Sequence, residues 1–462
     1  MIDRRLLSLM GLLWLGGCSM TPEFSLPKAP VPAEWPVQNV GEGRDDHPLP
    51  WNRFYGHPLL QKLIGQALAS NRDLRVAAAR MEKAAAQLGV TTSTRWPALQ
   101  GDVAHQVARA PADLSGSGKA TISRREEIGI ALPAFELDFW GRLSSLEEGA
   151  RSTYLASGQT ALALRIVLIS QVMEAFITWR EMEERIAFAH EMLRIGEEVR
   201  NFEEQRVGVG VTPAQTELRA AMEMEGVRAE WVELTRQKEL AANALQLLLG
   251  ASWERDLSWP TLEGLDLALQ IRLALPDQVL QSRPDVRAAE QRLRAAHANV
   301  GAVRAAFWPR ILLTTAIGTA SRELSGLFVP GSAVWSFAPR LDVPIFDFSR
   351  RKNELAAVEA ERQALLAEYE KVLQQAFREV ADALISSGKL LDRLVAVTTT
   401  RDKQLERVRL ITERYRAGLD GRQAYLLARQ ELYATQQQLL IAQRQRLVNQ
   451  VTLYKALGGG VE

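Results

Sequence analysis

The side chains that could do chemistry are few in this sequence of 462 residues, and they lie far apart. The histidines lack the close spacing of metal ligands in known sites. They are His47, His57, His105, His190 and His297. The glycine run 458–460 precedes no helix, so it does not predict a loop that cradles phosphate. We therefore expect no catalytic residues, no metal site and no cofactor.

The only cysteine, Cys18, ends a segment with the layout of a signal peptide. Arg4 and Arg5 precede an apolar run, residues 6–15, that is too short to span a bilayer. The closing Leu-Gly-Gly-Cys resembles the lipobox of bacterial lipoproteins. It predicts cleavage before Cys18, a lipid on that residue and, with Ser19 next, an outer-membrane destination. An ordinary secretory signal with an incidental cysteine is the alternative, although a lone thiol forms no internal disulfide.

A charged turn at residues 414–422 is the second place where side chains could act. It sets Asp420 among Arg414, Arg416 and Arg422. A carboxylate can pair with a guanidinium group, or it can cap the helix that follows it. The residue types alone leave both roles open.

The sequence contains two copies of one long unit. Residues 73–97 match residues 285–309 without a gap, and both segments end in Trp-Pro. Further along, the offset between the copies changes from 212 to 208 residues, and the glycines of the later turns still align. A period this long indicates a duplicated domain. We assign the two copies to residues 61–250 and 273–458.

Long helices must position the turns, because proline is absent from residues 134–212, 214–259 and 345–462. Each copy is expected to contain an opening helix, a β-hairpin, a long helix and a return helix. The long helices would extend roughly 95–100 Å at 1.5 Å per residue. The expected helices are 61–90, 143–205, 213–249, 283–306, 351–416 and 421–457.

The breaks between long and return helices predict helix hairpins. Gly210 and Gly418 suit the left-handed conformation that ends a helix. Thr212 and Asp420 follow, and each occupies the expected position of an N-cap. The last helix carries leucine or tyrosine every seven residues, which is typical of a coiled-coil seam.

The residues after each Trp-Pro alternate between apolar and polar side chains, which is typical of a β-strand. We predict β-hairpins at residues 97–137 and 310–346. Runs of about ten residues have the length of a transmembrane strand, and indole rings collect at the membrane boundary. A soluble, half-buried hairpin with a core tryptophan is the alternative. The transitions from helix to strand are expected at Trp96-Pro97 and Trp308-Pro309.

Four strands per chain cannot close a barrel in lipid. The edge strands would leave N–H and C=O groups without partners, and the smallest bacterial barrels have about eight strands. Transmembrane strands would therefore require several chains around one axis. The sequence predicts an α+β membrane protein with long helical hairpins, a shared antiparallel β-barrel and internal duplication.

The lipobox, the duplication, the Trp-Pro steps and the glycine-containing turns together resemble the TolC-like outer-membrane factors. They resemble in particular the lipoproteins that serve tripartite efflux pumps of the resistance–nodulation–division type. The resemblance covers essentially the whole mature chain. It implies a homotrimer, with a twelve-stranded β-barrel in outer-membrane lipid and a twelve-helix α-barrel tunnel through the periplasm. It also implies docking onto a periplasmic membrane-fusion adaptor and an inner-membrane pump.

This architecture divides the chain into six segments, of which the two repeats are the largest. They are a lipoprotein signal peptide (1–17), a tether and equatorial segment (18–60), the first repeat (61–250), an equatorial linker (251–272), the second repeat (273–458) and a tail (459–462).

The resemblance also assigns roles to the two turns. In the family, the periplasmic tip closes through an acidic ring and opens like an iris when the adaptor binds. Asp420 lies at the matching place, with Arg414, Arg416 and Arg422 available as partners; a helix cap alone is the alternative. Small and apolar tip residues are candidates for adaptor docking, with plain turn formation as the alternative. They are Val209, Gly210, Val211, Thr212, Ala417, Gly418 and Leu419.

The leading hypothesis is a passive exit duct for drugs or other small molecules. The alternatives are a duct for one-step protein secretion and a lipid-anchored periplasmic scaffold of coiled coils without a pore. A nucleic-acid partner is not expected, because the net charge is only +1. Without residues 1–17, which include Arg4, Arg5 and Asp3, 54 basic residues face 54 acidic ones.

Overall fold

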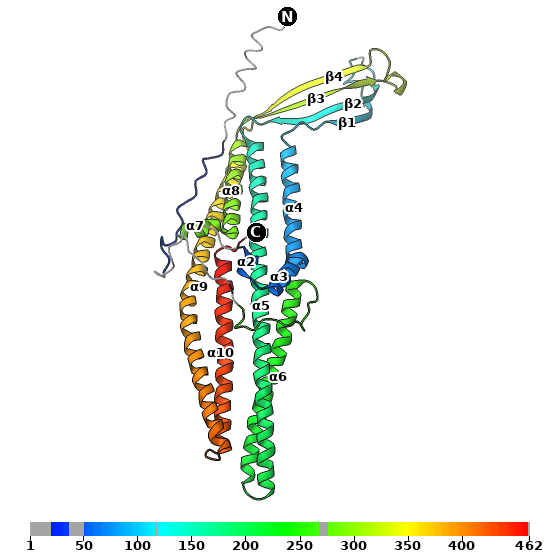
Figure 1. Cartoon of the computed structure of the whole chain (residues 1–462). Coiled ribbons are helices and arrows are strands. Elements are labelled where there is room, and N and C mark those ends of the chain that lie inside the picture. Colours follow the sequence, from blue (N-terminus) through cyan, green and yellow to red (C-terminus); the bar gives the residue numbers. More distant parts are fainter. Residues whose placement is uncertain (1–19, 37–49, 117, 266, 268–275, 461–462) are drawn as a thin grey trace. The chain divides into compact units, whose positions relative to one another are not determined.

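The computed structural model describes residues 20–36, 50–116, 118–265, 267 and 276–460 (Figure 1). The chain divides into two compact units. The first unit comprises residues 1–28, 80–158 and 288–370, and the second comprises residues 29–79, 159–287 and 371–462.

The first unit contains a four-stranded antiparallel sheet in the order β1-β2-β3-β4 (Figure 1). Both hairpins fall within the ranges expected from the alternation of side chains. Pro133 lies inside β2, and the register with β3 shifts between Leu132 and Phe135. Proline has no N–H to donate to a neighbouring strand, so a bulge at this place is expected. The strands are β1 (Gln100–Ala110), β2 (Thr121–Leu137), β3 (Arg310–Ser321) and β4 (Ala333–Asp342).

The helices follow the order of the two repeats, and the long ones extend slightly beyond the expected ends. α5 and α9 each contain 67 residues, which corresponds to roughly 100 Å. A single turn of 3₁₀ helix, η1 (Leu324–Gly326), lies between β3 and β4. The helices are α2 (Trp51–Phe54), α3 (Pro58–Ser70), α4 (Arg72–Ser93), α5 (Arg142–Gly208), α6 (Ala214–Leu249), α7 (Pro276–Ser282), α8 (Pro284–Ala305), α9 (Arg350–Arg416) and α10 (Arg422–Ala456).

The opening helix of the first repeat is interrupted, so the prediction of one helix over residues 61–90 is wrong. The interruption is at Asn71, whose Oδ1 accepts hydrogen bonds from the backbone N–H groups of Asp73 and Leu74. This side-chain cap starts α4 as a new helix. Asn71 Nδ2 also donates to the carbonyl of Leu248, 2.9 Å away, near the end of the return helix α6.

Arg283 fills the equivalent position in the second repeat, between α7 and α8. One of its terminal nitrogens donates to the carbonyl of Ala456, 2.7 Å away, near the end of α10. Ala456 lies 208 residues after Leu248, so the two repeats make the same contact with different side chains. The structure thus preserves the duplication at a point where the residue types have diverged.

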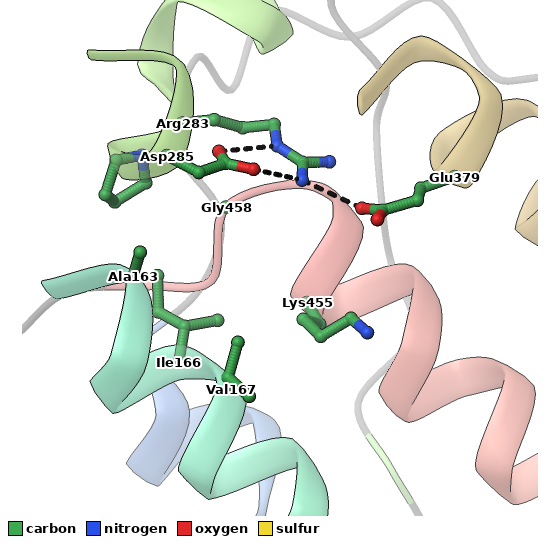
Figure 2. A pocket seen from close by; sticks show the side chains of 9 residues that line it. Ala163, Ile166, Val167, Arg283, Asp285, Glu379, Lys455 and Gly458 are labelled. Atoms are coloured by element: carbon green, nitrogen blue, oxygen red, sulfur yellow. Dashed lines mark hydrogen bonds and ion pairs between the residues drawn. The ribbon is translucent and has the colours of Figure 1, made fainter. Parts of the chain in front are cut away.

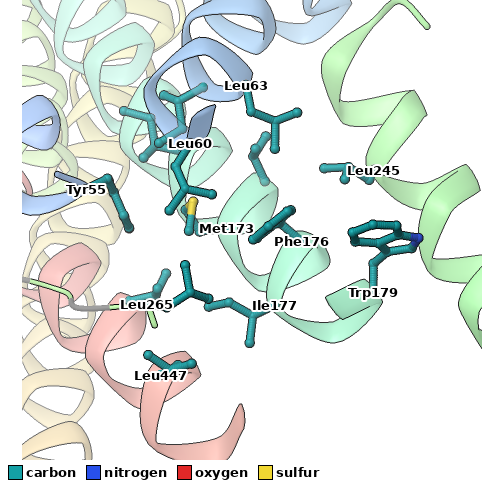
Figure 3. Packing of buried hydrophobic residues seen from close by; sticks show 14 of the residues in the cluster. Tyr55, Leu60, Leu63, Met173, Phe176, Ile177, Trp179, Leu245, Leu265 and Leu447 are labelled. Atoms are coloured by element: carbon teal, nitrogen blue, oxygen red, sulfur yellow. The ribbon is translucent and has the colours of Figure 1, made fainter. Parts of the chain in front are cut away.

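The main apolar core lies in the second unit, where α3, α5, α6 and α10 meet (Figure 3). Phe176, Ile177 and Trp179 of α5 are buried in it. α5 contains a stretch that is long and apolar enough to cross a membrane by length and composition. Val172 and Met173 of α5 are buried in this core, which accounts for part of that apolar composition.

Candidate functional site

The two turns between the long helices have the same backbone geometry. Gly210 and Gly418 adopt φ values of 71° and 74°, the left-handed conformation expected for a glycine after a helix. The N–H of Val211 bonds to the carbonyl of Arg206, and the N–H of Leu419 bonds to the carbonyl of Arg414, each at 2.9 Å. These contacts form a Schellman motif in both repeats, because they satisfy carbonyls that the helix leaves free.

The proposed docking residues lie at the tips of these turns. Val209, Val211 and Leu419 expose 75%, 64% and 68% of their surface. Gly210, Ala417 and Gly418 are exposed as well. In a Schellman motif the residue after the glycine often packs back onto the helix. Here the side chains of Val211 and Leu419 remain exposed to solvent instead. The turn conformation therefore does not account for the apolar character of the tips.

Neither Thr212 nor Asp420 caps a helix with its side chain, so the predicted N-caps are wrong. α6 begins at Ala214 with Pro213 in the cap position, and α10 begins at Arg422 with Gly421 there. The predicted capping residues thus lie one position too early to reach the free N–H groups of the first turn. Thr212 Oγ1 is buried and has no hydrogen-bond partner within the described chain.

Asp420 instead forms a two-pronged ion pair with Arg414 across its own turn. Arg414 Nε and Nη2 donate to the two carboxylate oxygens at 2.8 and 3.0 Å. These hydrogen bonds lower the pKa of Asp420 below its usual value and raise that of Arg414. The carboxylate is therefore ionised at neutral pH, and the pair joins the end of α9 to the turn that precedes α10.

The other two predicted partners of Asp420 do not contact it. The guanidinium of Arg422 lies over the ring of Phe202 at the end of α5, 4.4 Å from its centroid. Arg416 is exposed and makes no ion pair with any residue that the structure describes. This role of Phe202 was not predicted from the sequence. The only indication in the sequence is that Phe202 is an aromatic residue near the tip of an otherwise charged helix segment.

A seam of polar contacts joins α5 to α10 in the part of α5 that precedes Phe202. Glu181, whose side chain is only 1% exposed, pairs with Arg444 at 2.6 Å. Further along, Arg185 Nε donates to Gln437 Oε1 at 2.5 Å, and Gln437 Nε2 donates to the carbonyl of Arg185 at 3.2 Å. Arg429 pairs with Glu191 at 3.1 Å. The seam holds the return helix of the second repeat against the long helix of the first.

A small cavity of about 130 Å³ lies in the second unit near the end of α10 (Figure 2). The buried guanidinium of Arg283 lies between the carboxylates of Asp285 and Glu379, at 2.7 and 2.8 Å. The hydrogen bonds from Arg283 lower the pKa of Asp285 against the opposing effect of burial, which is the larger single influence. Because Arg283 is already bonded to two carboxylates and a carbonyl, we interpret this cluster as a structural tie.

Apolar side chains on α6 remain exposed along a single face. At 100° per residue they lie within about 80° of each other around the helix axis. α9 carries a second exposed apolar set. The α6 residues are Leu218, Met222, Val232, Leu240 and Leu247, and the α9 residues are Ile385, Leu391, Val395, Leu405 and Leu410. Exposed apolar side chains that lie together on one helix face mark contact surfaces more often than free surface.

The sheet has one apolar face and one face of polar or small residues, as the alternation predicted. Cross-strand partners share a face, and Val103 pairs with Ile128 while Ile317 pairs with both Ile130 and Trp335. On the opposite face, Asp102 pairs with Gly129. The apolar face is largely open, with Val103 and Trp335 exposing 78% and 77% of their surface.

The Trp-Pro pairs lie between helix and strand in both repeats. Trp96-Pro97 lies between Ser93, the end of α4, and Gln100, the start of β1; Trp308-Pro309 lies between α8 and β3. Trp96 is 72% exposed. Trp308 stacks on Trp140, whose indole N–H donates to the carbonyl of Pro309 at 2.8 Å. Trp140 was not predicted, because nothing in its local sequence indicates this contact.

Cys18 and the preceding leader lie outside the described residues, as do parts of both equatorial segments. The lipid on Cys18 therefore stays a prediction. Among the residues that are described, no group of three or more His, Cys, Asp or Glu side chains is placed to hold a metal ion.

A sequence model of the outer membrane efflux protein family matches residues 63–251 and again residues 275–459. Two matches of one model to successive parts of the chain confirm the internal duplication.

Individual relatives match over nearly the full length. The chain is 37% identical to the outer membrane protein OprJ of Pseudomonas aeruginosa, over 98% of this chain and 95% of that protein. It is 39% identical to the toluene efflux pump outer membrane protein TtgF of Pseudomonas putida, over 96% and 95%. Among solved structures, the open state of the MtrE outer membrane channel of Neisseria gonorrhoeae matches with a TM-score of 0.87 at 33% identity, over 96% and 99%.

Proposed function

The chain belongs to the outer membrane efflux protein family, and from this premise we propose that it is a trimeric channel-tunnel. In this proposal three chains build one β-barrel in the outer membrane and one helical tunnel below it. The tunnel is the passive exit duct of a tripartite efflux pump for drugs or other small molecules. The pump and its adaptor supply the energy and the substrate selection.

The observation that carries this proposal is the four-stranded sheet with two free edges. β1 and β4 each pair with only one neighbour among the described strands. Free edges cannot lie in lipid, because their backbone groups would lack hydrogen-bond partners. Three copies supply twelve strands, and edge pairing between copies removes every free edge. The exposed apolar residues of α6 and α9 support the same assembly, since a neighbouring chain would cover them.

The trimer is tested on the full-length protein extracted from outer membranes in mild detergent. We expect an oligomer of three chains that dissociates only on heating, and single-channel conductance after reconstitution into planar bilayers. A monomer, or a trimer without conductance, would favour the lipid-anchored scaffold instead. Mass analysis of the N-terminal peptide of the same preparation tests the lipid on Cys18.

We further propose that the exposed tips at Val209–Val211 and Ala417–Leu419 receive a periplasmic adaptor. The proposal rests on their exposure and on turn geometry that leaves Val211 and Leu419 unpacked. Cross-linking from cysteines introduced at Val211 and Leu419 to a purified adaptor tests the contact. Absence of cross-links from both positions, with cross-links from the helix flanks, would move docking away from the tips.

Asp420 is proposed to hold the periplasmic end closed through its pair with Arg414. Replacing Asp420 by alanine should raise the conductance of reconstituted channels roughly two- to fivefold, the effect of losing one exposed ion pair per chain. Thr212→Ala changes the equivalent residue of the first repeat, which carries no charge, and is the matched control. Unchanged conductance in Asp420→Ala, or an equal rise in Thr212→Ala, would remove Asp420 from the gate.

The pH dependence of the same channel gives an independent check. Because hydrogen bonds lower the pKa of Asp420 in the folded protein, the closing contact is present above the ordinary aspartate pKa of 3.8 and is lost below it. Conductance of the unmodified channel should therefore stay constant from neutral pH to about pH 4 and rise in more acidic solution. Asp420→Ala should lack this rise.

A further inference from the structure

The apolar face of the sheet ends in charged side chains toward the β1–β2 turn. Between the rows of Ile311 and Thr319, this face spans eight residues of β3, roughly 26 Å. At the 35–45° tilt of strands in outer-membrane barrels, this length corresponds to a height of roughly 20 Å, which is most of the roughly 25 Å apolar band. The rows beyond it therefore lie, in the proposed orientation, at the level of the outer-leaflet headgroups.

The first charged row pairs His105 of β1 with Glu126 of β2. Their side chains meet at 2.6 Å, and Glu126 is only 7% exposed. This carboxylate is buried and bonded to His105, so it presents little negative charge to the surroundings. On the opposite face of β2, Glu127 is paired with Arg125 at 2.9 Å.

The next two rows each combine one apolar side chain with one arginine. Arg124 lies opposite Val107, and Arg109 lies opposite Ile122. Val107 and Ile122 expose 53% and 66% of their surface, and both arginines are exposed. Neither arginine forms an ion pair with any part of the chain that the structure describes. An arginine stem beside an apolar side chain, with its charge at the rim, is the arrangement found where acyl chains meet headgroups.

We propose that Arg109 and Arg124 bind the phosphate groups of lipid headgroups in the outer leaflet. The guanidinium fork binds phosphate with two parallel hydrogen bonds, while Val107 and Ile122 contact the upper acyl chains. The three-chain barrel would repeat this pair three times around its rim. The inference rests on the proposed membrane position of the sheet. It adds a preference for lipids that carry phosphate, which the apolar band alone does not provide.

The test measures binding of lipid A to the full-length protein in detergent, with phosphorylated and dephosphorylated lipid A compared by native mass spectrometry. The unmodified protein should prefer the phosphorylated form. The double variant Arg109→Gln, Arg124→Gln should bind that form roughly 25-fold more weakly, since each basic side chain near an anionic surface contributes about a fivefold factor.

Arg125→Gln is the matched control, because Arg125 neighbours Arg124 on the same strand but lies on the other face. It should bind phosphorylated lipid A as the unmodified protein does. Equal binding by the double variant, equal binding of dephosphorylated lipid, or an equal loss in Arg125→Gln would each overturn the inference. Oligomer size and conductance are measured on the same preparations. If these are intact while the phosphate preference is absent, the lipid site fails and the channel proposal stands.

Discussion

Replacing Arg444 by methionine should lower the free energy of unfolding by about 3–4 kcal/mol at neutral pH. Arg444 is the partner of Glu181, whose carboxylate is buried between α5 and α10. Removing one member of a buried ion pair leaves an uncompensated charge away from water, which costs more than the pair itself contributes. Arg185 remains 3.5 Å from Glu181 and limits the loss. Thermal and urea unfolding followed by helical circular dichroism measure the change.

Two control variants separate burial from pairing. Arg407→Met removes an ion pair between α9 and α10, in which the side chains of Arg407 and Glu431 are 44% and 37% exposed. It should lower the free energy of unfolding by less than about 1 kcal/mol. Glu181→Gln combined with Arg444→Met removes both charges and should recover most of the stability. A double variant as unstable as Arg444→Met alone would show that lost packing, not the buried charge, sets the effect.

The loss of unfolding free energy in Arg444→Met should also depend on pH. Burial raises the pKa of Glu181 above its usual value, and the two arginines oppose this shift. The folded state therefore binds a proton more tightly than the unfolded state, and stability falls as pH rises from the ordinary glutamate pKa of 4.5 through the folded pKa. Without Arg444 the folded pKa rises further, so the variant should be closest to the unmodified protein in mildly acidic solution.

Replacing Gly250 by alanine should destabilise the second unit by more than about 3 kcal/mol. Gly250 ends α6 with a φ of 67°, which alone costs an L-residue about 1–2 kcal/mol. A Cβ there would also lie 2.5 Å from the carbonyl oxygen of Ser70 and 2.9 Å from its carbon. These are backbone atoms at the break between α3 and α4, so relief requires the chain itself to move.

Gly210→Ala isolates the two contributions. Gly210 has nearly the same φ, 71°, but a Cβ added there meets nothing within 4 Å. It should therefore cost only the conformational part, about 1–2 kcal/mol. Equal losses in the two variants, measured by thermal unfolding, would show that the contact with Ser70 does not constrain the residue at 250.

The corrections at the turns share one cause. Thr212 and Asp420 matched the residue types of an N-cap, but a cap depends on which residue immediately precedes the first helical N–H groups. The chain places Pro213 and Gly421 there. Asp420 then pairs with Arg414, six residues earlier along the chain. The contact of Arg422 also depends on tertiary structure. Its partner Phe202 is 220 residues distant in sequence, and the packing of α10 on α5 brings the two together.

The amino-acid sequence by itself determined the duplication, the long helices, the hairpins and the glycines of the turns. Each of these depends on local periodicity, on proline and glycine, or on a repeat that can be read along one chain. Tertiary structure alone decided the partner of Asp420, the ring under Arg422, the stack of Trp140 on Trp308 and the tie made by Arg283. These contacts depend on distances between segments far apart in sequence, and side-chain type does not encode such distances.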